Sequence, residues 1–599
     1  MSDTGAGAAS RRPRIASLWE RHRARWTLPL VIIVIIGAVA IIDHLGSNRI
    51  SQVDQPTTSQ LVAATGGAAT VELDQPWSGF NPNTPAGQAS STATLLSSVL
   101  PSAYVVNSKL LPQVNSDLLL SVEATSTSPL TIQYVINPKA VWSDGVPVTA
   151  DDFVYAWQSQ RGDGVDVDGQ PDAVASTLGY DDVSSVKPSD NGKTVTVTFS
   201  TPYTDWRDLF DHMVPAHIAR RVGWNDGFDT FNPAVDLSAG PDILHSASGG
   251  QAVLTRNPRW WGTPAVLDRV TVNVARGQEA WTAALATGNE TVAQPTSFDM
   301  DGLQAASSLP NTQSVLKASP NFLDLEFNVA SSVTDRVVVR QAIALAIDRA
   351  SLLAHTFGSL DPDLVIDEDH LATAFQPSYS PSSAAGEYAT SDLGATDRLL
   401  RSIGFHRDAL GEYLNTDGRP LTLRMAVATG DPWISEVATQ ITAQLHNAGI
   451  DVVTVPVAGT AGLEAEEATN SYDMALVTRV TSPYPTTTTG WYSATVGGVG
   501  IADQQDWSQF DDPRVDQLFT QAAQALDPVV GGTIYAQIDD QLWDQMVALP
   551  LFGEPALLAN GVQITGMQYD PSADGILWNV SQWNTLKPSP ADKGKSPAG

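Results

Sequence analysis

The stretch AVWSDGVPVTADDFVYAW, residues 140–157, carries the signals of a tight turn followed at once by a helix start. Asp144 and Gly145 form a dipeptide typical of turns, and Pro147 stiffens the approach to the next element. Trp142 precedes the turn in a short apolar run. We therefore interpret the stretch as a strand, a turn and a helix in succession.

The helix start is defined by Thr149 and the two acidic residues that follow it. Thr149 fits the N-cap position, and Asp152 can return a hydrogen bond to it as in a capping box, although Glu or Gln is commoner there. Asp151 and Asp152 also meet the positive end of the helix dipole. Helix initiation explains these carboxylates better than acid–base catalysis, which stays as the alternative.

Segments with strand or helix periodicity lie on both sides of this stretch. Alternating apolar residues predict strands at 130–136, 193–199, 251–257 and 267–274. Apolar residues at helical spacing predict helices at 335–358, 431–450 and 512–526, the last with Asp512 as cap and Pro513 in its first turn. This mixture predicts an α/β protein whose apolar stripes form core.

Composition excludes several classes of protein. Hydrophobic residues make up 42% of the chain and charged residues 16%, which favours large buried cores over disorder. The formal net charge of −32 repels phosphate backbones, so no nucleic-acid partner is expected. The chain has no Cys, which excludes disulfides, Cys-zinc sites, iron–sulfur clusters, cysteine nucleophiles and the cysteine-based lipoprotein anchor.

The N-terminus resembles a membrane-targeting segment. Six Arg residues between 11 and 25 precede an uncharged apolar run at 26–42, which as a helix would be roughly 26 Å long and near the lower limit for a bilayer. The Arg cluster predicts a cytoplasmic N-terminus, 1–25, and an extracytoplasmic body. A signal anchor, a signal peptide cleaved after Ala40 and a buried core helix are the alternatives, of which the anchor is favoured.

Motifs for catalysis or metal binding are absent or incomplete. The sequence has no G-x-S-x-G elbow, P-loop, H-E-x-x-H or G-x-G-x-x-G. The Gly-rich run 497–500 favours a loop over a phosphate cradle, and Pro215 separates His212 from His217, a poor spacing for a metal pair. Residues 162–172 resemble a calcium loop but lack its first and twelfth carboxylates, so an acidic surface loop is preferred. No metal or cofactor is predicted.

Residues 139–157 closely resemble a signature of the family 5, peptide/nickel-type extracytoplasmic solute-binding proteins, which are receptors of ABC importers. Four further segments resemble this family in the same order: WSGFNPNT (77–84), RNPRWWG (256–262), LEFNVASSVTDRVVVRQAIALAIDR (325–349) and IYAQIDDQLWDQMVALPLF (534–552). The resemblance runs from about residue 70 to 584, and an actinobacterial member is expected. The residues that carry it are Trp142, Asp144, Gly145, Thr149, Asp152, Asn257, Trp261, Asn328, Arg340, Asp348 and Arg349.

The resemblance implies a three-lobed, periplasmic-binding-protein-like α/β fold with a ligand cleft between lobes I and III, closed by a hinge. Lobe I would comprise 70–84, 237–318 and 550–584, lobe II 85–236, and lobe III 319–549. A linker at 43–69 and a disordered tail at 585–599 would flank this body. Such clefts bury most of a small ligand and orient it with a few polar groups.

The stretch ALVTRVTSPYPTTTTGWYSA, residues 475–494, departs from the family pattern. Peptide binders of the family carry an Asp there for the peptide amino group, whereas Arg479 is the only charged residue here. A buried ammonium without a counter-charge is costly, so an anionic or neutral polar ligand is favoured over free peptides. The candidate ligand-binding residues are Arg479, Tyr484, Trp491, Tyr492, Ser90 and Ser91, with a solvated Arg479 and core aromatics as the alternative.

Three functions follow, in order of preference. The first is the binding subunit of an ABC importer, a membrane-anchored monomer that captures a peptide-like or other polar or anionic solute without chemistry and works with a permease and an ATPase. The second is a protein of the same fold adapted to envelope assembly, because some actinobacterial members resembling this class act in lipoglycan synthesis. The third is a hydrolase with an unrecognised site.

Overall fold

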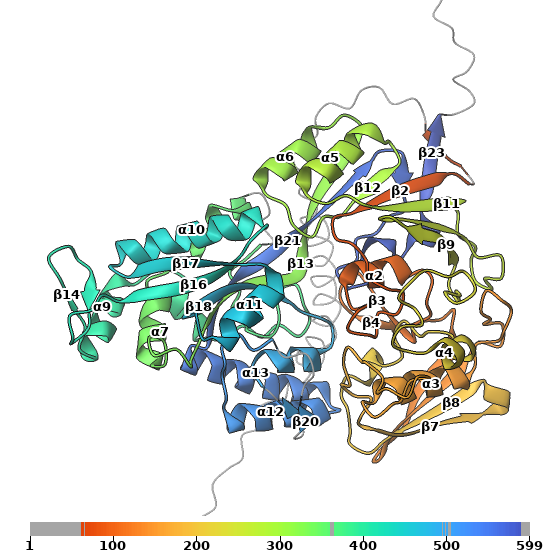
Figure 1. Ribbon diagram of the computed structural model, residues 1–599, viewed down its shortest axis with the longest axis horizontal. Coiled ribbons are helices and arrows are strands. Elements are labelled where there is room, and N and C mark those ends of the chain that lie inside the picture. The colour runs from red at the N-terminus through yellow and green to blue at the C-terminus, as the bar shows by residue number, and fades with distance from the viewer. Residues whose placement is uncertain are drawn as a thin grey trace, which may run out of the picture. The chain divides into compact units, whose positions relative to one another are not determined.

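The computed structural model describes residues 61–64, 66–359, 364–493, 495–496, 499–500 and 505–588. Residues Val62–Lys587 form one compact unit (Figure 1). The predicted cytoplasmic segment 1–25 and anchor 26–42 lie outside the described residues. Within those residues, no helix is both long and apolar enough to cross a membrane.

The folded body extends slightly beyond its predicted limits. Strand β1 (Leu61–Ala64) and the first two residues of β2 (Ala68–Leu73) lie in the predicted linker, and β23 (Asn584–Pro588) occupies the start of the predicted tail. β23 lies between β1 and β22 (Ile564–Thr565) in a three-stranded sheet. These two strands from opposite ends of the body thus pair with each other, a tertiary effect that composition does not indicate.

A ten-stranded mixed sheet is the largest element of the fold. Its order is β17 (Asp451–Val457), β16 (Thr422–Ala428), β18 (Met474–Val480), β13 (Thr312–Phe327), β21 (Ala548–Gly561), β12 (Thr291–Ala293), β2, β11 (Arg269–Val274), β10 (Gln251–Arg256) and β9 (Asp242–Ser248). β16 runs parallel to β17 and β18, and β2 runs parallel to β11 and β12. These parallel groups meet through antiparallel pairs made by β13 and β21.

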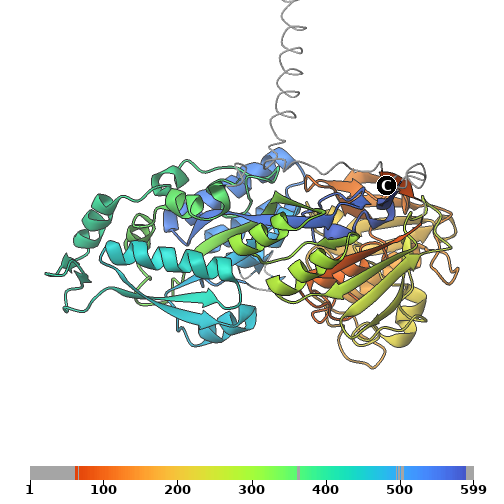
Figure 2. The same cartoon turned by 90° about the horizontal axis from the view of Figure 1, so that it is seen from above.

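The long strands β13 and β21 lie side by side through the middle of this sheet (Figures 1 and 2). Their pairing shifts register between Ala318 and Phe322, opposite Gly553 and Pro555, and again after Leu323. Irregular pairing of this kind bends a strand and frees backbone groups from the ladder.

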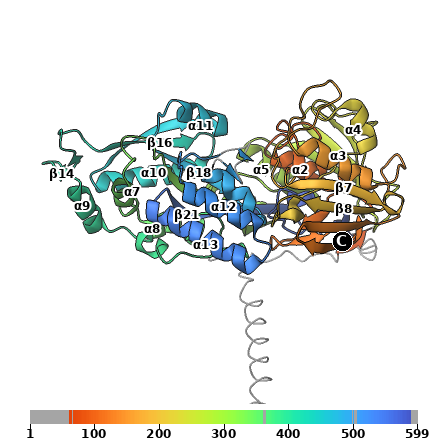
Figure 3. The same cartoon turned by 90° about the horizontal axis from the view of Figure 1, so that it is seen from below.

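A second sheet has four strands in the order β5 (Leu119–Thr127), β6 (Leu130–Ile136), β8 (Thr194–Phe199) and β7 (Val183–Ser189). The predicted alternation in β6 is confirmed, because Leu130, Ile132, Tyr134 and Ile136 are all buried. The predicted strands at 193–199, 251–257 and 267–274 correspond to β8, β10 and β11. Helices α3 (Ala150–Gln160) and α4 (Ala216–Val222) lie beside this sheet (Figure 3).

The capping box predicted at the start of α3 is confirmed. The Thr149 hydroxyl accepts a hydrogen bond from the Asp151 amide, and Asp152 Oδ2 accepts one from the Thr149 amide at 2.8 Å. Asp152 Oδ1 also accepts a bond from the amide of Ala216, at the start of α4, at 3.0 Å. Asp152 therefore starts one helix and fixes the next one against it.

Two of the three predicted helices are confirmed and one is divided. The helices α10 (Pro432–Asn447) and α12 (Pro513–Gln524) match prediction, the latter capped by Asp512. The segment predicted as one helix, 335–358, forms α7 (Val337–Ala344) and α8 (Arg349–Ala354). The break occurs because Asp348 caps α8 through the Ser351 amide, while its own amide donates to Gln444 of α10 at 2.7 Å. The remaining helices are α2 (Ser90–Leu96), α5 (Gln278–Thr287), α6 (Met300–Ser308), α9 (Leu393–Ser402), α11 (Gly459–Ala468) and α13 (Pro528–Gln545).

The buried apolar residues form two large clusters that share the central sheet. One contains β2, α2, the four-stranded sheet, β9–β11 and residues 576–583. The other contains α5–α8, α10, β16, β18 and the first part of β21. β21 contributes Leu558 to the first cluster and Leu549, Leu551 and Leu557 to the second.

We predict that the two acidic residues after Thr149 differ sharply in their contribution to stability. Asp152→Ala removes the carboxylate that accepts from two backbone amides at a buried site and should lower the free energy of unfolding by about 2–3 kcal/mol. Asp151→Ala removes only an exposed pair with Arg220 and should cost less than about 1 kcal/mol. Denaturant unfolding of both variants measures the difference; equal losses would contradict the capping role of Asp152.

Candidate functional site

The described part of the chain contains a cleft of about 1020 Å³. Its lining comes from segments far apart in the chain: residues 73–75, 207–209, 294–297, 319–321, 429–431, 480–484, 554–556 and 569–576, with Asp211, Thr478, Thr487, Trp491, Gln505 and parts of α2 and of β3 (Tyr104–Val106). Residues 319–321 of β13 and Glu554 of β21 fall in the register shift, where the two strands lose their regular pairing. The cleft therefore opens where the central sheet loses its regular pairing.

Four of the six candidate ligand-binding residues line this cleft: Ser90, Ser91, Tyr484 and Trp491. Ser91 uses its hydroxyl to donate to the Pro76 carbonyl at 2.8 Å. Tyr484 donates to the carbonyl of Arg207 at 3.1 Å. The tertiary structure thus brings α2 and the 475–494 stretch to one cavity.

Arg479 and Tyr492 lie behind the described lining of the cleft, in the core. Arg479 is 1% exposed and forms an ion pair with Glu326, which is fully buried. Its guanidinium lies 4.9 Å from the centre of the Trp491 ring. Tyr492 donates to Asp324 Oδ2 at 3.2 Å.

These contacts correct the expectation that Arg479 meets an anionic ligand. The charge of its guanidinium is matched inside the protein by Glu326, so it is not free to serve as a counter-charge in the cleft. Burial raises the pKa of Glu326, and the Arg479 guanidinium opposes that rise. The Arg479 guanidinium therefore packs against the Trp491 ring within the core.

The charged groups that line the cleft are mainly acidic. Burial is the largest cause of the raised pKa values of Asp208, to about 8, and of Asp570 and Glu554, each to about 7. Repulsion from Asp211 adds to the rise at Asp208. Among the described residues of the lining, Arg207 is the one Lys or Arg. Sequence reasoning missed these carboxylates because they are scattered along the chain; the net charge of −32 was their only signal.

His212 connects two segments at the edge of this cleft. Its ring Nδ1 lies 2.7 Å from Asp211 Oδ2, and its Nε2 lies 3.3 Å from Asp574 Oδ1. Burial opposes protonation, but the two carboxylates raise the pKa of His212 well above its ordinary value. A protonated His212 therefore joins the 211 and 574 segments electrostatically.

A hydrogen-bonded seam joins residues 203–207 to the 484–486 segment and to the end of α12. Thr486 donates to Asp205 Oδ2 through its amide at 2.9 Å and through its hydroxyl at 2.8 Å. Tyr203 Oη lies 2.9 Å from the same hydroxyl, and the Thr204 amide donates to the Ala523 carbonyl at 2.7 Å. This seam holds together two segments that both line or adjoin the cleft.

The residues that carry the family signature have structural contacts. Arg340 donates to the carbonyls of Thr334 and Met546, and Arg349 donates to those of Tyr388, Asp367 and Pro550. Four other signature residues also form side-chain hydrogen bonds with the backbone: Asn257 with Gly240, Trp261 with Asp117, Asn328 with Tyr472, and Asp144 with Val146. Trp142 is fully buried, and Gly145 adopts a positive φ.

The weaker metal-site candidates are used otherwise. His212 binds acidic partners, and His217 lies 2.9 Å from Asp144 Oδ2. In the 162–172 loop, Asp166 accepts from the amides of Trp224 and Asn225. No group of His, Asp or Glu within the described ranges is arranged to hold a metal ion. The Gly-rich run 497–500 is described only in part.

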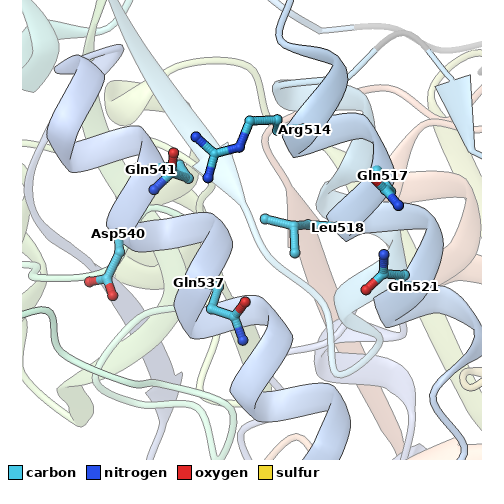
Figure 4. A pocket seen from close by; sticks show the side chains of 7 residues that line it. All are labelled: Arg514, Gln517, Leu518, Gln521, Gln537, Asp540 and Gln541. Carbon is cyan, nitrogen blue, oxygen red and sulfur yellow. The ribbon is translucent and has the colours of Figure 1, made fainter.

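A second pocket of about 220 Å³ lies between α12 and α13 (Figure 4). The helices face each other across it with Arg514, Gln517, Leu518 and Gln521 on α12 and Gln537, Asp540 and Gln541 on α13. This pocket is several times smaller than the cleft, and a single helix pair builds it. The cleft is therefore the candidate functional site.

Comparison with known proteins agrees with a binding cleft. Residues 113–499 match the profile of the bacterial extracellular solute-binding proteins, family 5 (middle region). The chain is 27% identical over 483 residues to the oligopeptide-binding protein OppA of Mycobacterium tuberculosis, covering 79% of this chain and 77% of OppA. It is 28% identical over 406 residues to the probable monoacyl phosphatidylinositol tetramannoside-binding protein LpqW of the same species, covering 64% of this chain and 60% of LpqW.

Solved structures of such proteins share the fold. The periplasmic EDTA-binding protein EppA superimposes with a TM-score of 0.80 at 24% identity, covering 89% of this chain and 99% of EppA. NikZ from Campylobacter jejuni, in complex with Ni(L-His), gives a TM-score of 0.72 at 16% identity, covering 86% and 99%. The predicted α/β fold, lobed as in periplasmic binding proteins, is thereby confirmed.

We predict that Arg479 contributes chiefly to stability. Arg479→Met leaves Glu326 buried without its partner and should lower the free energy of unfolding by about 3–5 kcal/mol. Replacing both partners, as in Arg479→Met with Glu326→Leu, should recover most of that loss because no buried charge is left unpaired. Denaturant unfolding of the single and double variants tests this; a double variant as unstable as the single one would argue against the pair.

The seam predicts a local effect of Thr486. Thr486→Val keeps the side-chain shape but removes the hydroxyl between Tyr203 and Asp205, so amide hydrogen exchange in residues 203–207 should quicken by about tenfold. Thr439→Val, on the exposed face of α10, is the matched control and should leave that segment unchanged. Unaltered exchange in both variants would mean that the seam is held by other contacts.

Proposed function

Because this chain belongs to the bacterial extracellular solute-binding proteins, family 5, we propose that it captures a small solute in its cleft and delivers it to the permease of an ABC importer, powered by a separate ATPase. The single observation that carries this proposal is the cleft of about 1020 Å³, built from segments throughout the chain. A cavity of that size buries most of an oligopeptide-sized or cofactor-sized molecule. The protein would act as a monomer and leave the solute chemically unchanged.

The proposed mechanism is closure of two lobes about the central sheet. Lobe I (70–84, 237–318 and 550–584) and lobe III (319–549) meet at β13 and β21, with lobe II at 85–236. The register shift beside Ala318 supports this division, because irregular pairing bends more easily than a regular ladder. The seam between residues 203–207 and 484–486 would then hold the closed form.

The solute is proposed to be peptide-like or another polar molecule. Similarity to OppA over most of both chains supports a peptide-like solute. Ser90, Ser91, Tyr484 and Trp491 would contact it, since all four line the cleft. Arg479 and Tyr492 would act indirectly, by fixing Trp491 and the strand behind it.

A placement on the outer side of the cell membrane follows from this function. The family is one of extracellular proteins, and the six Arg residues before the apolar run 26–42 support an N-terminal anchor or signal peptide. Tethering would keep the binding protein near its permease.

A second candidate function is a role in envelope assembly. It is favoured by the similarity to LpqW, whose name describes binding of a mannosylated phosphatidylinositol. The two functions predict different guests, a soluble small molecule or a glycolipid headgroup. Titration with phosphatidylinositol mannosides in detergent, beside soluble peptides, distinguishes them.

We predict that the purified protein carries or accepts a small molecule that native mass spectrometry detects unaltered. At about 100 times its Kd, such a ligand should stabilise the protein by about 2.7 kcal/mol in thermal unfolding. Thr487→Trp obstructs the cleft from an exposed position and should abolish this stabilisation, whereas Thr439→Trp on α10 should not. Stabilisation that survives Thr487→Trp, or a ligand recovered as a different compound, would refute the proposal.

A further inference from the structure

The acidic residues of the cleft come from several segments that are far apart in the chain. Asp74 follows β2, and Asp570 lies in the 569–576 segment. Asp208 lies beside Arg207 on the 207–211 segment. Glu554 lies on β21, and Asp431 caps α10. A guest in the cleft therefore meets carboxylates from several segments.

The basic groups near the cleft do not balance these carboxylates. Arg207 is exposed and lies over the ring of Trp206 at 4.1 Å. His212 is committed to Asp211 and Asp574, and Arg479 is committed to Glu326. The remaining acidic groups, Asp74, Asp208, Asp431, Glu554 and Asp570, have no matching cation among the described residues of the lining.

Asp570 gives a second, independent indication that the cleft binds a hydrogen-bond donor. Its side chain is 0% exposed, and its Oδ1 accepts from the Ser572 amide at 2.7 Å. Its Oδ2 finds no hydrogen-bond donor within the described part of the chain. A buried carboxylate oxygen without a donor is costly, and here it belongs to a residue that lines a large cavity.

Other acidic residues of the cleft are partly satisfied by the protein. Asp74 Oδ2 accepts from the amide and hydroxyl of Thr296 at 2.7 and 2.9 Å. Glu554 Oε1 accepts from Trp433 Nε1 at 3.1 Å and from Thr478 at 2.7 Å. These bonds hold the carboxylates in fixed positions in the cleft lining.

We propose that the solute is an organic cation with two or more protonated alkylamines, held in the cleft by Asp570 and Glu554. This inference rests on the proposed solute-binding function and names the class of solute. Alkylammonium groups supply both the positive charge and the donors that these carboxylates need. A lysine-rich oligopeptide and a linear polyamine share that chemistry and are the two sources to be distinguished.

The test is calorimetric titration of the whole protein with four probes: tri-lysine, spermidine, blocked tri-alanine and tri-glutamate. Both cations, or one of them, should bind at least about tenfold more tightly than the neutral and anionic probes, and that affinity should fall as salt is raised. Tighter binding of tri-lysine indicates a peptide source, and tighter binding of spermidine indicates a polyamine. Equal or tighter binding of tri-alanine or tri-glutamate overturns the inference but leaves solute binding intact.

Charge-neutralising variants locate the interaction. Asp570→Asn should weaken the preferred cation by about tenfold while leaving tri-alanine binding unchanged, and Glu554→Gln should act in the same direction. Asp417→Asn, an exposed residue outside the described lining, makes the same charge change and should have no effect. Since the four-probe comparison uses the unaltered protein, a variant that folds poorly does not remove the test.

The outcomes separate the two proposals. If the cations bind but Asp570→Asn and Glu554→Gln both match Asp417→Asn, the assigned site is wrong. If no probe binds and no small molecule accompanies the purified protein, the proposed function fails together with the inference. If a neutral or anionic compound accompanies it, solute binding is supported and the cationic class is refuted.

Discussion

The pairing of β13 with β21 is the constraint on which the rest of the structure depends. These two strands join the parallel group β16–β18 to the group around β2, so both large cores are built against them. Their register shift beside Ala318 interrupts the ladder at one place. Residues 319–321 and Glu554, which have no partner in the β13–β21 ladder at this place, line the cleft. The same irregularity therefore interrupts the ladder and places Glu554 in the cleft lining.

Among the described residues, charged groups are paired in the core behind Trp491 but are mostly unpaired and acidic on the cleft side of its ring. Behind the ring, Arg479 and Glu326 neutralise each other in the core, an arrangement that stabilises only while both are present. On the cleft side, carboxylates outnumber basic groups among the described lining residues, and burial raises the pKa values of several of them. A guest that brings positive charge would relieve this repulsion, whereas an anionic guest would increase it. Membership of the family does not identify the solute, whereas the excess of carboxylates in the cleft lining favours a positively charged one.

Local patterns were good guides wherever neighbours along the chain decide the conformation. Thr149 and Asp152 satisfy each other's backbone within one turn, and the apolar stripes of α10 and α12 each mark one continuous helix. The segment 335–358 shows the limit of such patterns. Its apolar periodicity is continuous, yet Asp348 ends the run because Gln444, distant in sequence, binds the Asp348 amide. The ends of the body illustrate the same limit, since β1 and β23 pair with each other.

The sequence by itself determined the family, the α/β class, most strands and helices, and the presence of a single charge in the 475–494 stretch. It also named six candidate ligand-binding residues, of which Ser90, Ser91, Tyr484 and Trp491 line one cleft. Only the tertiary structure decided that Arg479 faces Glu326 and that Asp74, Asp570 and Glu554 share a cavity. The physical reason is that electrostatic partners are chosen by distance in space, and long-range strand pairing sets those distances without leaving a mark in any short stretch of residues.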